Sequence, residues 1–64
     1  MLAVAKLIQK KNVNGWFIRL VFFRNAYLVN FTAPNGIPYY KKFSSLTQAQ
    51  AFFAFLCQKL KTSK

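Results

Sequence analysis

The side chains that could carry chemistry belong to few types in this chain of 64 residues, which has lysine, arginine, tyrosine and one cysteine but no aspartate, glutamate or histidine. General acid–base catalysis would have only Lys, Tyr and Cys groups available, and a metal ion would lack a set of ligands. Cys57 falls on or beside the apolar stripe of an expected helix and has no histidine to activate it, so we interpret it as a small core residue. We therefore expect no enzymatic activity, no cofactor and no metal site.

The charge balance indicates an anionic partner. Lysine and arginine number 10, so the formal net charge is +10, whereas average usage would supply roughly 8 acidic residues in a chain of this size. A chain with this charge repels itself when compact, and it tolerates that repulsion because its working partner is an anion. The candidates are nucleic acid, an anionic membrane and an acidic protein. A basic surface without a partner is the alternative, but such surfaces normally contain interspersed acids.

The N-terminal residues favour an intracellular protein. The segment MLAVAKLIQKK lacks a basic n-region, and Lys6 interrupts its apolar part early, so it does not read as a secretion signal. No uncharged apolar stretch approaches the roughly 18 residues of a membrane span, and a single Cys57 suits a reducing compartment. We expect a cytoplasmic protein, nucleoid-associated or otherwise intracellular in a host, with no membrane partner. Its size and charge alone suggest a source among phages and other mobile elements.

Hydrophobic patterning predicts strands followed by one helix. The expected strands are 2–9, 16–23, 26–32 and 37–43; the first is Ala-rich and also compatible with a helix. Turn chemistry is expected at 10–15, which contains Asn14-Gly15, at Arg24-Asn25 and at 33–36. Pro38, near the start of the last strand, favours an edge position there.

The expected helix covers residues 46–61. Ser45 and Gln48 form a capping box ahead of an apolar periodic run. One arc of about 140° contains the expected core face, made of Leu46, Ala49, Phe52, Phe53, Leu56, Cys57 and Leu60. Phe55 lies nearly opposite this stripe and is predicted to be exposed. The fold class is therefore α+β: a single domain over 1–64, with an antiparallel three- or four-stranded sheet packed on one face by a single C-terminal helix.

The segment WFIRLVFFR, residues 16–24, sets two arginines in an apolar run. Side chains of a strand alternate between its faces. The apolar positions Trp16, Ile18, Leu20 and Phe22 should meet the helix, and Phe17, Arg19, Val21 and Phe23 should point away from it. Arg19 would then lie among apolar groups on an uncovered face, a composition typical of a nucleic-acid-reading sheet. The alternative is that a second subunit covers this face and Arg19 lies at the rim.

The lysines are spread over turns, strand ends and the helix tail, which suits phosphate contacts without sequence reading. Tyr39 and Tyr40 precede Lys41-Lys42 and form an aromatic and basic cluster that could stack on bases or sugars; alternatively, one tyrosine belongs to the core and the other to the surface. The candidate nucleic-acid-binding residues are Phe17, Arg19, Arg24, Lys10, Lys11, Tyr40, Lys41 and Lys42.

Two short motifs resemble those of AP2-type domains and of the arm-binding N-terminal domains of tyrosine integrases. The segment WFIRL at 16–20 is similar to their W-x-x-R-[IL] strand, and KKFSSLTQAQAFF at 41–53 is similar to their F-x-T-x-x-x-A helix entry. The resemblance covers about a third of the chain. It implies three antiparallel strands backed by a helix, with Arg19 entering the DNA major groove. Lys41-Lys42 replaces the usual Leu-Gly, the 16–43 interval is longer, and the acidic residues of the helix are missing.

The function that these observations favour is non-enzymatic binding of nucleic acid, with double-stranded DNA preferred over RNA. One alternative is an RNA-binding ribonucleoprotein component. A second is an inhibitor or adaptor that binds an acidic protein surface, and a third is a membrane-active cationic protein, against which the turns and capping box argue. Aromatic residues form 19% of the chain, so contact with a protein partner or a homodimer through exposed aromatics also stays open.

Overall fold

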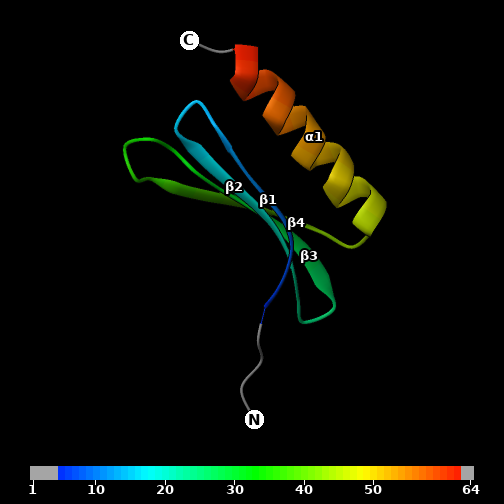
Figure 1. Cartoon of the computed structure of the whole chain (residues 1–64). Coiled ribbons are helices and arrows are strands. Elements are labelled where there is room, and N and C mark those ends of the chain that lie inside the picture. The colour runs from blue at the N-terminus through cyan, green and yellow to red at the C-terminus, as the bar shows by residue number, and fades with distance from the viewer. Residues whose placement is uncertain (1–4, 63–64) are drawn as a thin grey trace.

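The computed structural model describes residues 5–62 and consists of a sheet and one helix. The elements are β1 (Lys6–Val13), β2 (Trp16–Phe23), β3 (Ala26–Thr32), β4 (Pro38–Phe43) and α1 (Leu46–Thr62). The strands form one antiparallel sheet in the order β1-β2-β3-β4, and α1 crosses one face of it (Figure 1). The expected α+β class, with a three- or four-stranded sheet and one C-terminal helix, is confirmed, and the sheet has four strands.

The first strand is where the sequence-based prediction was wrong. It was expected at 2–9, with turn residues from 10 onward, but β1 extends to Val13; residues 2–4 of the expected strand lie outside the described part. Asn14 and Gly15 have φ of 51° and 86°, which is the two-residue turn that joins the closely paired strands of a hairpin. Pairing must then continue up to Val13, so Lys10 and Lys11 belong to a strand and not to a turn.

The remaining boundaries follow the predictions closely. Strands β2 and β3 have the expected limits, β4 begins at Pro38, and α1 extends to Thr62. Arg24 and Asn25 form a second two-residue turn, with φ of 52° and 60°. Pro38 begins a strand at the edge of the sheet, as its missing N–H requires.

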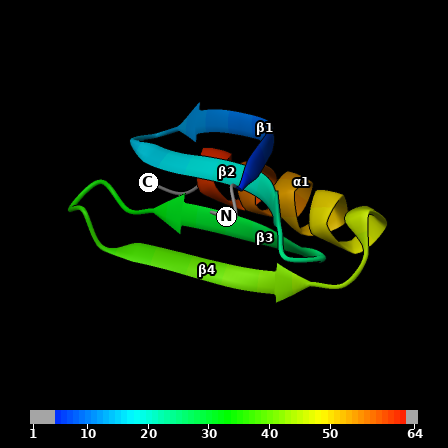
Figure 2. The same ribbon diagram turned by 90° about the horizontal axis from the view of Figure 1, so that it is seen from below.

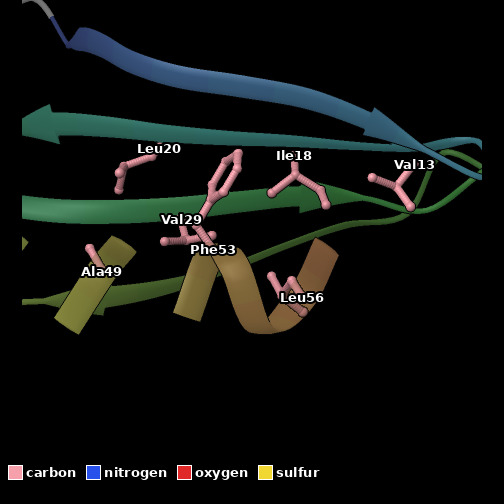
Figure 3. Packing of buried hydrophobic residues seen from close by; sticks show 7 residues of the cluster. All are labelled: Val13, Ile18, Leu20, Val29, Ala49, Phe53 and Leu56. Atoms are coloured by element: carbon pink, nitrogen blue, oxygen red, sulfur yellow. The ribbon is translucent and has the colours of Figure 1, made fainter. Parts of the chain in front are cut away.

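The core lies between α1 and the sheet (Figure 3). It contains Val13, Ile18, Leu20 and Val29 from the strands and Ala49, Phe53 and Leu56 from the helix. Ile18 and Leu20 are fully buried, so alternate residues of β2 do face the helix as predicted. Phe55 is 55% exposed, also as predicted.

One residue of the expected helix stripe does not enter the core. Leu46 is 36% exposed, because α1 contacts the sheet through Ala49, Phe53 and Leu56 and its first turn lies at the border of this contact. Cys57, expected to be a small core residue, is half-buried and packs against the core from its edge.

Candidate nucleic-acid interface

The sheet has one face that no other described element covers. In Figure 2 the four strands lie side by side in front of α1, so this face points toward the viewer. Cross-strand pairing assigns fourteen side chains to it: Leu7, Lys10 and Asn12 of β1; Phe17, Arg19, Val21 and Phe23 of β2; Ala26, Leu28, Asn30 and Thr32 of β3; and Pro38, Tyr40 and Lys42 of β4. We call this surface the open face.

A polar row crosses the middle of the open face. Lys10 pairs with Arg19, Arg19 with Asn30, and Asn30 with Tyr40, so one residue from each strand contributes to the row. Directly opposite residues of an antiparallel pair have Cβ atoms about 4.5–5.5 Å apart. The four side chains therefore form a line of hydrogen-bonding groups perpendicular to the strands, with the two cations at the β1 and β2 positions.

Apolar side chains lie on both sides of this row, although only one side is mainly apolar. Leu7, Val21 and Leu28 form the adjacent row toward one end of the sheet, and Val21 is only 7% exposed although it lies away from α1. The row on the other side is mixed and consists of Asn12, Phe17, Thr32 and Pro38. The polar row of the open face thus has three apolar side chains on one side and an exposed aromatic ring, Phe17, on the other.

Both arginines rest on aromatic rings. Arg19 Cζ lies 5.4 Å from the centroid of the Phe17 ring, and Arg24 Cζ lies 5.3 Å from that of Phe23. Attraction between a cation and the face of a ring holds each guanidinium in place without an acidic partner. Because Phe17 and Phe23 belong to the open face, their rings hold both guanidinium groups beside it.

The structure separates the predicted site residues into three groups. Five of the eight lie on the open face, namely Phe17, Arg19, Lys10, Tyr40 and Lys42. Arg24 occupies the β2–β3 turn next to Phe23. Lys11 and Lys41 are paired with the core residues Ile18 and Val29 and therefore belong to the opposite, helix-covered face.

The two neighbouring tyrosines of β4 have different surroundings. Tyr40 is 70% exposed on the open face. Tyr39 faces the other way and stacks on Phe31, with ring centroids 5.5 Å apart, and it also contacts Trp16 at 6.1 Å. The pair is therefore one tyrosine of the open face and one that packs on the border of the core.

Asn30 is the residue that the sequence-based reasoning did not select. It lies in the middle of β3, between Arg19 and Tyr40 in the polar row. Its position follows from alternation along 26–32, where Tyr27, Val29 and Phe31 are the apolar positions that meet α1. This alternation was available in the sequence, but it was applied only to the neighbouring strand.

A groove lies between β1 and α1. It has a volume of about 550 Å³ and is lined by Gln9, Lys11, Gln50, Cys57 and Lys61, among others. Its lining includes amides, two lysines and one thiol. It lies on the helix side of the sheet, away from the open face.

Two other kinds of feature, a metal-ligand cluster and a membrane-spanning helix, are not found among the described residues. Residues 5–62 contain no group of three or more metal-ligating side chains. In the same range, no helix is long and apolar enough to cross a bilayer. Comparison with protein-family models, with curated proteins and with solved structures found no match.

Proposed function

We propose that this chain binds double-stranded DNA through the open face, with β2 and β3 in the major groove. The observation that carries the proposal is the polar row, in which Arg19 and Asn30 occupy the two central strands and Lys10 and Tyr40 the two edge strands. A major groove about 12 Å wide admits a two-stranded ribbon. The hairpin of β2 and β3 fits within this width, because neighbouring strands lie about 4.8 Å apart.

The edge strands are suited to phosphate contacts. With β2 and β3 in the groove, β1 and β4 lie over its two walls, where the DNA backbones run. Lys10 on β1 and Lys42 on β4 are exposed cations of the open face, and the exposed Tyr40 adds a hydroxyl donor. Contacts of this kind set position and orientation, and base contacts supply sequence preference.

The charge of the whole chain supports an anionic partner of this class. The net charge is +10 and no acidic side chain is present, so every cationic side chain lacks an Asp or Glu partner within the chain. Release of condensed counterions from DNA then provides a driving force that does not depend on sequence.

Fluorescence anisotropy would test the proposal with matched duplex DNA, single-stranded DNA and duplex RNA over a range of salt. We expect the tightest binding to duplex DNA and a slope of log K against log salt of about −0.9 for each phosphate contacted. Lys10→Gln should make the slope less steep by about 0.9. The matched control is Lys59→Gln, which removes the same charge from the helix side and should leave the slope unchanged.

Two outcomes would redirect the proposal. Binding to all three probes that disappears by about 0.15 M salt would show only nonspecific attraction by charge, and an acidic protein partner would then be sought. Preference for single strands would favour stacking of bases on Tyr40 and Phe17, whose rings are exposed on the open face. That second candidate uses the same face but a different nucleic acid.

A further inference from the structure

Arg19 and Asn30 are paired in the centre of the open face, and both have side chains that can form two hydrogen bonds with a base. From these two residues we infer that the protein reads a particular DNA step, a G·C pair next to an A·T pair. This inference rests on the proposed function, since it assigns base preference to the same face. It does not follow from DNA binding itself, because a basic surface can bind duplexes of every sequence equally well.

Asn30 is difficult to explain as a structural residue. Asparagine is disfavoured within strands, yet Asn30 lies in the middle of β3, with Leu28 and Thr32 as its neighbours on the same face. Within the described part of the chain its side chain makes no hydrogen bond. A half-buried amide without a partner among the described residues is available to an external one.

The spacing between Arg19 and Asn30 is close to the spacing between consecutive base pairs. Arg19 and Asn30 are directly opposite each other on neighbouring strands, so their Cβ atoms are about 4.5–5.5 Å apart and point to the same side. Base pairs in a duplex follow one another at about 3.4 Å. Flexible side chains of this length bridge the difference, and each can therefore meet its own base pair.

The hydrogen-bonding groups complement two different bases. The guanidinium of Arg19 can donate two hydrogen bonds to O6 and N7 of guanine, which is the commonest specific contact in the major groove. The amide of Asn30 can donate to N7 of adenine and accept from its N6 amino group. Phe17 limits the orientations of the guanidinium, since Arg19 Cζ lies 5.4 Å from its ring centroid.

Selection from a duplex pool of random sequence tests the inference. The pool has about ten randomised base pairs, one helical turn, between constant flanks. The wild-type protein should enrich sequences that contain a G·C pair next to an A·T pair, with a discrimination of about ten-fold or more at each position. Asn30→Thr should remove the preference at the A·T position alone, and Arg19→Lys should weaken the preference at the G·C position alone.

The variants are chosen so that they keep the fold. Threonine favours strands, and lysine keeps the charge of Arg19. Circular dichroism and a thermal melt would check both proteins, and Lys10→Gln is the matched control because a phosphate contact should lower affinity for all sequences equally. In both variants the enriched pool should change at one position only.

Any result of the selection other than the expected one overturns the inference. Retention of the pool without an enriched motif would refute base reading by this pair while leaving DNA binding intact. A motif that Asn30→Thr leaves unchanged would also refute base reading by this pair and leave DNA binding intact. If the pool is not retained at about 0.15 M salt, the proposed function fails and this inference with it.

Discussion

At the scale of single residues, the main feature is how cations are held in a chain without acids. Four basic side chains lie over aromatic rings: Arg19 over Phe17, Arg24 over Phe23, Lys41 over Phe52 and Lys59 over Phe55. Each such contact at an exposed site contributes about 0.5–1 kcal/mol. A ring orients a cation but does not neutralise it, so the full charge stays available to an anion.

The ring beneath Arg19 gives a prediction at this scale. In Phe17→Leu the guanidinium loses the contact at 5.4 Å and becomes free to adopt more orientations. We expect the affinity for duplex DNA to fall about two- to five-fold, which corresponds to the strength of an exposed cation–π contact. Anisotropy at a single salt concentration measures this change.

Phe17→Tyr is the control for this experiment, because it keeps the aromatic ring and should bind duplex DNA like the wild type. Equal losses in the two variants would show that Phe17 acts through its particular shape and not through contact with Arg19.

At the scale of elements, the β1–β2 turn connects the sheet to the end of the helix. Asn14 Nδ2 donates hydrogen bonds to the carbonyl oxygens of Leu60 at 2.7 Å and Lys61 at 3.3 Å. The last carbonyls of a helix have no partner within the helix, so the turn supplies one from a distant part of the chain. Gly15 of the same turn also lies close to the β3–β4 loop, since a Cβ there would be 3.1 Å from Pro34 Cγ.

The loss of this connection should lower stability measurably. Asn14→Gly keeps a residue that tolerates the φ of 51° but removes the hydrogen bonds to the helix. We expect a loss of about 1 kcal/mol, or a fall in Tm of roughly 4–8 °C. Thermal melts followed by circular dichroism would show it.

Asn25→Gly is the matched control for the second hairpin turn, where φ is 60°. It changes the same residue type at a similar backbone angle, and no hydrogen bond joins the Asn25 side chain to another described residue. A Tm fall as large as that of Asn14→Gly would mean that the turn conformation matters and the contact with α1 does not.

At the scale of the whole molecule, all charged side chains have the same sign. The chain has a net charge of +10 without one acidic residue, so long-range electrostatics between side chains can only oppose the compact state. Most proteins contain both attractive and repulsive pairs, and salt weakens both kinds. Here salt should weaken repulsion alone.

We therefore expect Tm to rise with NaCl. An increase from about 0.01 M to about 1 M shortens the Debye length from roughly 30 Å to roughly 3 Å, which screens the exposed lysines from one another. The variant Lys42→Gln should raise Tm at the low salt concentration and have little effect at the high one. A Tm that falls as salt is added would contradict this account of the charge.

The sequence was sufficient for the local features of the fold. Period-two alternation in 16–23 correctly placed Ile18 and Leu20 toward the helix, and the helical stripe correctly placed Phe53 and Leu56 in the core. These patterns extend over a few neighbouring residues, and the burial of one face is enough to produce them. The same reasoning identified Arg19 as a residue of the uncovered face.

Which residues of β1 belong to the open face depended on the tertiary structure. Leu7 and Lys10 share this face only because a bulge between Leu7 and Gln9 shifts the pairing of β1 with β2. A shift of one residue moves every side chain to the other face, so the identities of residues 10 and 11 could not decide which lysine lies beside Arg19.

The sequence by itself thus determined the charge, the turn at Arg24-Asn25 and which side of 16–23 is buried, since these depend on residue type and short-range spacing. Only the tertiary structure decided that Lys10, Arg19, Asn30 and Tyr40 form one row across four strands. The physical reason is that cross-strand neighbours are set by hydrogen-bonded pairing between segments that are distant in the sequence. That pairing depends on turn lengths and a bulge that local patterns do not specify.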